Sequence, residues 1–307
     1  MEKKRDNKKR RSVLTVLASL VLCVVFVTLL VFFRYYPRYV REKEPVSIPA
    51  SESQITVMSY NLRCLTPLDL GKKSWFYRAA LIMDDLQAQA PDIIGFQEAT
   101  KWQHDYLLDC LPEYGSIITY RDDSMIAEGC PIYYHGGRFT MVDQGTFWLS
   151  ETPEVMSKDW GAAHYRVCSY AILRDKTTGE ELVVFNTHLD HVSDEARING
   201  IGVILDKIEE FGGLPAIIMG DLNAEEGSAT YVNATVHFLD ARYEAAQTTD
   251  SYTYHVWGDV EKSCRIDYFL LSRDAFSVES YTVLAQPHDG IWSSDHAPLV
   301  MKLFLEE

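Results

Sequence analysis

The sequence lacks any run of basic residues after residue 44. Residues 1–44 hold eleven Lys and Arg against four acidic residues, a net charge of +7, so the chain total of −15 leaves −22 for residues 45–307. A domain this acidic repels a long polyanion such as duplex DNA unless metal ions or a local basic patch intervene. The charge balance therefore favours a small substrate over a long nucleic acid.

Metal-binding cysteine pairs are also missing. Of six cysteines, Cys23 lies inside a long apolar run, and the other five are odd in number with no CxxC spacing among them. Neither a zinc site nor a complete disulfide framework is indicated, and free, buried thiols are expected instead. These thiols are Cys64, Cys110, Cys130, Cys168 and Cys264.

A single long hydrophobic run is present near the N-terminus. Ser12–Phe33 contains 22 residues without one charge, and as a helix it would span roughly 33 Å, about one hydrocarbon core. The alternative is a cleaved signal peptide, whose apolar region is about 7–15 residues long and ends in small residues. Here the run is longer and bulky residues follow it at 34–38. The pattern favours an uncleaved transmembrane anchor.

The charges around this run predict its orientation. Seven basic residues lie within residues 1–11 and four follow the run more sparsely, so the tail 1–11 is expected in the cytoplasm of a single-pass cell-membrane protein. Residues 34–53, with three prolines and no apolar period, are typical of a short extended tether. Residues 54–307 then form an extracytoplasmic domain.

Short apolar runs separated by turns predict the architecture of this domain. The expected strands are Ile55–Tyr60, Ile93–Phe96, Ile132–Tyr134, Val167–Leu173, Leu182–Asn186, Ala216–Met219, Ile266–Leu271 and Leu299–Phe304. Helical patterns cover Arg78–Gln89 and Glu195–Phe211. Strands that outnumber interspersed helices predict an α/β fold of two packed sheets with helices outside.

Polar residues gather at the ends of these strands. The five clusters are Asn61, Gln97-Glu98, Asn186-Thr187-His188, Asp221-Leu222-Asn223 and Ser293-Ser294-Asp295-His296. Any one cluster is explained by a turn or a cap. Five of them together indicate a convergent site, because strand ends that share a sheet edge lie close together.

The residue types in these clusters suit phosphoester hydrolysis. Glu98 and Asn61 offer hard oxygen ligands that fit Mg²⁺ or Mn²⁺. Such an ion polarises a phosphoryl oxygen, a carboxylate deprotonates the water, and an imidazole protonates the leaving oxygen. The clusters therefore predict a metal-dependent phosphoesterase.

Six motifs occur in a recognisable order over residues 54–305: SYNLR, GFQEA, NTHLDH, GDLNAEEGS, RIDYFLLS and SSDHAPL. This order resembles the endonuclease/exonuclease/phosphatase superfamily, which includes deoxyribonucleases, neutral sphingomyelinases, inositol phosphatases and deadenylases. The stretches EGCPIYY, GTFWLSETPE and HYRVCSYAIL look like one bacterial, membrane-anchored branch of it. The resemblance implies a four-layer α/β sandwich with the active site at one edge of the two sheets.

The resemblance also implies roles for residues near the metal and the attacking water. Asn61 and Glu98 match metal-binding positions, and Asp295 matches a residue near the metal that is sometimes a ligand. Asp221 matches the residue that activates water, with Asn223 as its partner that contacts phosphate.

A second set of implied roles concerns the histidines. His296 matches the catalytic histidine, and Asp267 the carboxylate that orients it and raises its basicity. His188 matches a second phosphate-facing histidine, with Glu128 as its candidate partner. Arg166 is a candidate phosphate clamp.

Several functions fit this pattern. An active hydrolase is favoured because every required position holds a competent residue, whereas a catalytically inactive binding module would be expected to have lost one of them. A passive membrane scaffold leaves the acidic cluster unexplained. Within the hydrolases, the substrate is a sugar phosphate, a nucleotide, a lipid head group or extracellular nucleic acid, since fold does not determine substrate.

Four other residues have two interpretations each. Trp75 and Arg78 are expected in the core, although they could lie beside the site, and Asp190 and His191 would support the site or be exposed. Residues 102–104 are expected to begin a helix and lie at the surface.

Overall fold

The computed structural model describes residues 12–30, 45–51, 53–249 and 251–306. The chain divides into two units, Met1–Lys43 and Glu44–Glu307. The predicted cytoplasmic tail, the last three residues of the predicted span and residues 34–44 of the predicted tether lie outside the described residues.

The first unit contains a helix, Ser12–Leu30, with a mean hydropathy of 2.9 over its most apolar window and no buried residues. At 19 residues it extends roughly 28 Å. By length and composition it is the one helix in the described part of the chain that could cross a membrane.

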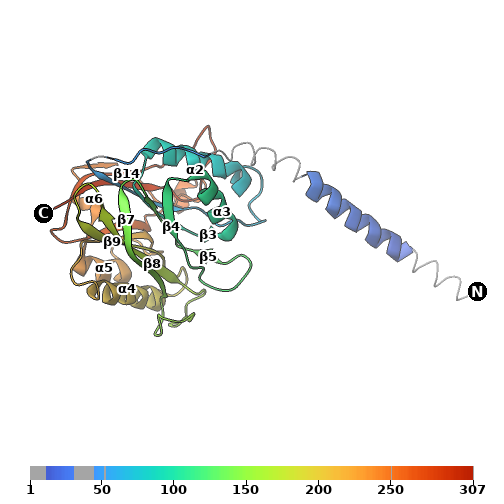
Figure 1. Cartoon of the computed structure of the whole chain (residues 1–307). Coiled ribbons are helices and arrows are strands. Elements are labelled where there is room, and N and C mark those ends of the chain that lie inside the picture. The colour runs from blue at the N-terminus through green and yellow to red at the C-terminus, as the bar shows by residue number, and fades with distance from the viewer. Residues whose placement is uncertain (1–11, 31–44, 52, 250, 307) are drawn as a thin grey trace, which may run out of the picture. The chain divides into compact units, whose positions relative to one another are not determined.

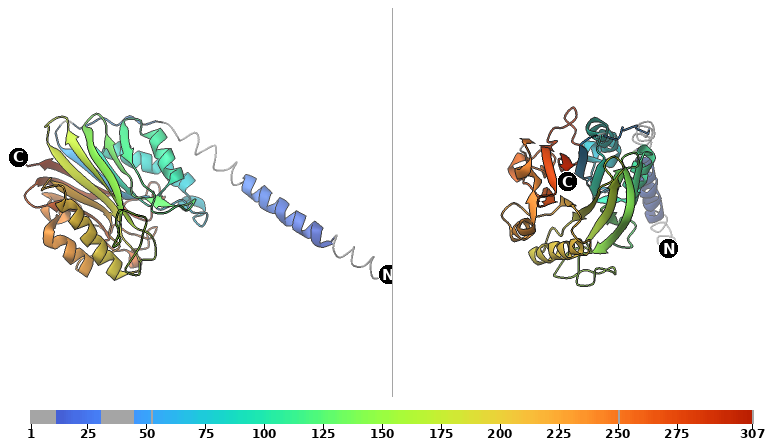
Figure 2. Two further views of the ribbon diagram at one scale, coloured as in Figure 1. Left: turned by 60° about the horizontal axis from the view of Figure 1, so that its bottom comes forward. Right: turned by 60° about the vertical axis from the view of Figure 1, so that its left-hand side comes forward.

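The second unit is built on two large β-sheets (Figures 1 and 2). The first has seven strands in the order β12 (Gln247–Thr249), β14 (Phe276–Val283), β15 (Leu299–Leu305), β1 (Ile55–Asn61), β2 (Ile93–Gln97), β6 (Ile132–His135) and β4 (Tyr114–Ile117). The second has six strands in the order β11 (Phe238–Asp240), β13 (Asp267–Ser272), β10 (Ala216–Asp221), β9 (Glu181–His188), β8 (Val167–Asp175) and β7 (Phe139–Trp148). A small third sheet pairs β3 (Ala99–Thr100) with β5 (Glu128–Gly129).

Helices cover the outer faces of the two large sheets. Figures 1 and 2 show α2 (Trp75–Gln89) and α3 (Lys101–Cys110) over the first sheet, and α4 (Asp194–Glu209) and α5 (Ala229–His237) over the second. A four-residue helix, α6 (Ala241–Glu244), and 3-10 turns at Gly71–Lys73 and Val260–Lys262 complete the described elements. The predicted four-layer α/β sandwich is confirmed.

The predicted strands and helices are found with small changes in their ends. Helix α4 ends at Glu209, two residues before the predicted end at Phe211, because the turn that contains Gly212 and Gly213 already begins at residue 210. Seven of the described strands were not predicted from the sequence: β3, β4, β5, β7, β11, β12 and β14. β7 is an edge strand with mostly exposed or half-buried residues, so it has no apolar run to reveal it.

The sheets approach each other closely beneath the strand ends. A Cβ atom on Gly95 of β2 would lie 2.6 Å from Met219 Cε and 2.8 Å from Asn186 Cγ in the other sheet. Next to it, Gln97 Nε2 donates to Asn186 Oδ1 at 2.7 Å, and both side chains are fully buried. This bridge joins the strand before Glu98 to the strand that carries His188, so it holds the two halves of the polar cluster together.

All five cysteines of the second unit are free thiols, as predicted. Cys110, Cys130 and Cys168 are buried, whereas Cys64 and Cys264 are partly exposed.

Candidate active site

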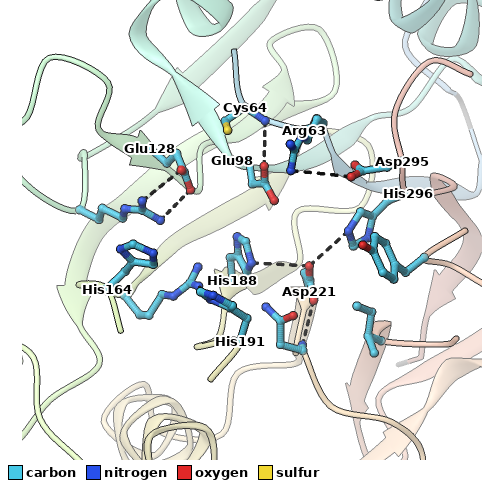
Figure 3. A pocket seen from close by; sticks show the side chains of 15 residues that line it. Arg63, Cys64, Glu98, Glu128, His164, His188, His191, Asp221, Asp295 and His296 are labelled. Carbon is cyan, nitrogen blue, oxygen red and sulfur yellow. Dashed lines mark hydrogen bonds and ion pairs between the residues drawn. The ribbon is translucent and has the colours of Figure 1, made fainter. Parts of the chain in front are cut away.

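Strand register brings the predicted residues to one edge of the sandwich. In the first sheet, Asn61 pairs with Gln97, the residue before Glu98. In the second sheet, Asp221 pairs with His188 on one side and with Asp267 on the other. These strand ends surround a cavity of about 300 Å³ (Figure 3).

Asp221 lies at the centre of the cavity wall, with one imidazole on either side (Figure 3). Its Oδ2 is 3.6 Å from His188 Nε2 and 3.7 Å from His296 Nε2. The Asn223 backbone N–H donates to its Oδ1 at 2.8 Å. Burial, followed by the charge of Asp267, raises the pKa of Asp221 to about 7. This carboxyl can therefore both accept and release a proton near neutral pH.

The two histidines are in opposite protonation states. Burial opposes a charge on His296, but Asp267, whose Oδ2 lies 2.9 Å from His296 Nδ1, raises the pKa of His296 to about 10. Burial and then the positive charge of Arg166 lower the pKa of His188 well below its ordinary value. At neutral pH His296 is an imidazolium that can donate a proton, whereas His188 is a neutral imidazole.

Two further carboxylates lie on the wall that carries Arg63. Asn61 Nδ2 donates to Glu98 Oε1 at 3.2 Å, and the Cys64 backbone N–H donates to Glu98 Oε2 at 2.8 Å. Burial opposes a charge on Glu98, but the Cys64 N–H and then the His296 charge lower its pKa. Asp295 lies 3.8 Å from Arg63 Nη1, and burial raises its pKa.

This set of donors fits a hard divalent cation. Three carboxylates share one cavity: Asp221 and Asp295 are buried and Glu98 is half-buried. Carboxylates withdrawn from water in this way require compensating positive charge. Asn61 differs from the expected ligand in its contacts, because its amide nitrogen bridges Glu98 and Asp221 while its oxygen accepts the Arg63 N–H at 3.0 Å. Glu98 and Asp295 are therefore the stronger candidate ligands.

A second compact group of possible ligands is Asp221, Asp267 and His296, whose donor atoms lie within 4.8 Å of one another. In this group, however, Asp267 Oδ2 already accepts a hydrogen bond from His296 Nδ1 at 2.9 Å. The group is thus better suited to proton transfer than to holding an ion.

The opposite wall of the cavity carries positive charge. Arg121 forms a bidentate pair with Glu128 at 2.6 and 3.0 Å. Arg166 contacts His191 Nδ1 at 3.1 Å and lies 3.5 Å from Asp190. Both arginines line the cavity. A phosphate between the two walls would contact both the metal ligands and the arginines.

Matches to known proteins agree with this geometry. The family model for the endonuclease/exonuclease/phosphatase family matches residues 58–296. The chain belongs to this family. Its members are hydrolases of phosphoester bonds and generally depend on divalent metals.

Two solved structures from Bacteroides are similar to this family member along most of its length. An endonuclease/exonuclease/phosphatase of Bacteroides vulgatus is 32% identical with a TM-score of 0.79, and the match covers 83% of this chain and 100% of that one. A mannosyl-6-phosphatase of Bacteroides thetaiotaomicron is 32% identical with a TM-score of 0.76, and the match covers 81% and 99%.

More distant relatives are nucleases. The CCR4-Not complex 3'-5'-exoribonuclease subunit Ccr4 of Aspergillus niger is 23% identical over 276 residues, which cover 65% of this chain and 42% of the fungal protein. The chain thus spans less than half the length of this curated relative.

The described contacts of Glu128 go to a different residue from the expected one. Arg121 donates to both of its carboxylate oxygens, and the pairing of Glu128 with His188 stays a prediction. Asp221 is the carboxylate that lies nearest to His188 in an ion pair. Burial and then the charge of Glu98 raise the pKa of Glu128 to about 7.

The structure also decides the residues with two interpretations. Trp75 and Arg78 are buried, and the Arg78 guanidinium donates to the carbonyls of Leu62 and Ser293, so it braces the loops that carry the site. Gln103 is buried rather than at the surface, and its amide oxygen accepts the Leu65 N–H at 2.9 Å. His191 is exposed at the rim of the cavity.

Five cavity-lining residues had no role in the sequence interpretation. They are Arg63, Cys64, His164, Tyr254 and Ile266. Two of them had a signal in the sequence: Arg63 lies inside the SYNLR motif, and Ile266 lies inside RIDYFLLS, directly before Asp267. Cys64, His164 and Tyr254 come from loops whose positions depend on tertiary packing.

Proposed function

We propose that this chain is a divalent-metal-dependent phosphoesterase that hydrolyses a small phosphorylated molecule, with a sugar phosphomonoester as the favoured substrate. The observation that supports this most strongly is the arrangement around Asp221, a buried carboxyl between one protonated and one neutral imidazole. The Bacteroides mannosyl-6-phosphatase has the same fold at 32% identity.

In this proposal the ion is Mg²⁺ or Mn²⁺, held by Glu98 and Asp295 with Asn61 beside them. Such an ion offsets the charge that develops on the phosphoryl oxygens. Asp221 accepts the proton of the attacking water, and His296, oriented by Asp267, donates a proton to the leaving oxygen. His188, Asn223 and Arg166 contact the phosphate, and Glu128 keeps Arg121 in place beside them.

Charge and cavity size support the choice of a small substrate. The cavity of about 300 Å³ suits a small molecule, and residues 45–307 carry a net charge of −22. Arg63, Arg121 and Arg166 supply positive charge at the cavity. It would neutralise a phosphate but would not follow a long nucleic-acid backbone.

A nuclease is the second candidate, because the fungal relatives are exoribonucleases. We also propose that the helix Ser12–Leu30 anchors the chain in the cell membrane, with the enzymatic domain outside. A lipid head group is then a third class of substrate to test.

A substrate panel distinguishes these candidates. The full-length chain in detergent is assayed with Mg²⁺ or Mn²⁺ for phosphate release from mannose 6-phosphate, glucose 6-phosphate and nucleotides, and for cleavage of RNA, DNA, sphingomyelin and phosphoinositides. Asp221→Ala serves as the matched control for contaminating activity. We expect the highest kcat/KM on a sugar phosphate. Preference for RNA or DNA would contradict the proposal and support the nuclease.

A further inference from the structure

Thr253 is a fully buried residue outside every motif of the site, yet its polar groups contact the segments that carry the catalytic pair. Its side-chain hydroxyl accepts hydrogen bonds from the backbone N–H groups of Ile266 and Asp267, each at 3.0 Å. Asp267 is the carboxylate that binds His296.

The backbone of Thr253 contacts the other partner of the pair. Its carbonyl accepts the N–H of Ala297, the residue after His296, at 2.6 Å. The next residue, Tyr254, forms an isolated β-bridge with His296, and the two rings lie 4.7 Å apart between centroids. Thr253 thus holds the segments of Asp267 and His296 at the same time.

These contacts connect segments that are far apart in the chain. Asp267 begins β13, whereas His296 lies in the loop before β15, in the other sheet. Among the described contacts, Thr253 links the two through one side chain and one carbonyl. A buried hydroxyl that accepts two backbone N–H groups leaves both unpaired when it is removed.

We propose that Thr253 is a positioning residue that sets the orientation of the Asp267–His296 pair. This rests on the proposed function, because it assigns a role within that same site. Thr253 does not line the cavity, so it acts through Asp267 and His296 and not on the substrate.

The test compares three variants of the full-length chain in detergent with Mg²⁺ and mannose 6-phosphate. Thr253→Val keeps the shape but removes the acceptor, and it should lower kcat about 10- to 100-fold with KM within about threefold. Thr253→Ser keeps the hydroxyl and should stay within about threefold of wild type. In an Asp267→Asn background, Thr253→Val should lower kcat by less than about threefold, because both substitutions disrupt the same interaction.

A second readout does not depend on turnover. The proton shared by His296 and Asp267 should give a low-field ¹H NMR signal in the wild type and in Thr253→Ser, and this signal should be lost or shifted in Thr253→Val. Should Thr253→Val fail to fold, Thr253→Cys replaces it under the same criteria, since a thiol is a weak acceptor.

The results separate the two proposals. An inactive wild type with the expected NMR pattern would contradict the sugar-phosphate substrate but support the positioning role. Normal kcat and an unchanged NMR signal in Thr253→Val would overturn the positioning role. Equal losses of kcat in Thr253→Val and Thr253→Ser would also overturn it, as would effects of Thr253→Val and Asp267→Asn on kcat that are fully additive in free energy.

Discussion

At the scale of single residues, environment determines the function of each titratable group in the cavity. His188 and His296 are the same residue type on either side of Asp221, yet their pKa values move in opposite directions. The difference arises because His296 has Asp267 as a partner, whereas His188 lies beside Arg166. Paired groups with divergent pKa values are characteristic of acid–base sites.

Substitution of the central groups should separate catalysis from folding. We expect Asp221→Ala and His296→Ala each to lower kcat by about 10²–10⁴-fold with an unchanged melting curve. Asp267→Asn should be milder than His296→Ala, because it disturbs the orientation of the imidazole but keeps it. Turnover within about threefold of wild type for either alanine variant, in a folded protein, would refute the proposed mechanism.

A glycine directly before Asp221 is required by the close approach of two strands. Gly220 has φ of 133°, and a Cβ atom there would lie 2.0 Å from the Thr187 carbonyl oxygen. Gly220→Ala should therefore lower the free energy of unfolding by more than about 2 kcal/mol, measured by urea denaturation. Gly227→Ala is the control, because Gly227 also has positive φ but no atom within 4 Å of the added Cβ, and it should cost about 1 kcal/mol.

If the two glycine variants are equally stable, the close contact with Thr187 carries no energetic weight, and strand β10 must relax freely around the new methyl group.

At the scale of elements, loops with unusual backbone geometry present the site residues. Arg63, Glu98 and Asn223 all have positive φ, at 55°, 58° and 47°. This conformation is uncommon for residues other than glycine and tends to be retained where function requires it. In each case the residue follows the end of a strand, so the chain turns sharply and directs a side chain to the cavity edge.

Asp190 holds two loops of the cationic wall together. Its Oδ2 accepts the N–H groups of Ala163 and His164, and its Oδ1 accepts those of Val192 and Ser193. Burial opposes the charge, but these backbone donors lower the pKa of Asp190 to about 2. The ionised carboxylate therefore stabilises the fold at pH values above about 4, the unfolded pKa, and this contribution is lost as pH falls toward 2.

Asp190→Asn tests this role. The amide has one acceptor oxygen for four donors, so we expect a loss of about 1–3 kcal/mol in the free energy of unfolding at pH 7. The difference from wild type should shrink between about pH 4 and pH 2, because the protonated carboxyl resembles the amide. Exposed Asp123 supplies the control, as Asp123→Asn should change stability by less than about 0.5 kcal/mol. If the difference in the free energy of unfolding between wild type and Asp190→Asn does not change with pH, ionisation of Asp190 does not contribute to stability.

At the scale of the whole molecule, the surplus of buried carboxylates predicts dependence on a divalent cation. Hydrolysis should fall to background after exhaustive chelation and return with Mg²⁺ or Mn²⁺ but not with Ca²⁺ at equal concentration, since the smaller ions require fewer, more ordered ligands. The melting temperature should rise with Mg²⁺ in the wild type, because a ligand of the native state stabilises it. Glu98→Gln is the matched variant for this melting measurement, because it removes one proposed ligand. Full activity in the presence of the chelator would refute the metal site.

The charge asymmetry around Ser12–Leu30 predicts the orientation of the chain in the membrane. Seven basic residues precede the helix, so residues 45–307 should face outward. Protease added to intact cells should remove the domain together with a known surface protein, while a cytoplasmic marker stays intact. If the domain survives under these conditions, the proposed orientation is wrong.

Local sequence patterns were sufficient to predict the layers of the fold and the gathering of most candidate site residues at one sheet edge. Each apolar run such as Ile217–Met219 forms a buried strand, and each polar cluster after such a run lies at the strand end, because strand period and turn chemistry are local properties. The motifs GDLN and SDHAP are also local, so the family could be identified from residue order alone. Edge strand β7 was missed because its alternation is weak on a half-exposed face.

Contacts between distant segments were decided only by the tertiary structure. Glu128 pairs with Arg121, and the Thr253 hydroxyl accepts the backbone N–H of Asp267. Sheet register and the packing of one sheet on the other bring these partners together, and neither is encoded in any short window. The protonation states of the two histidines follow from those contacts, because burial and neighbouring charge shift a pKa and both are properties of the folded chain.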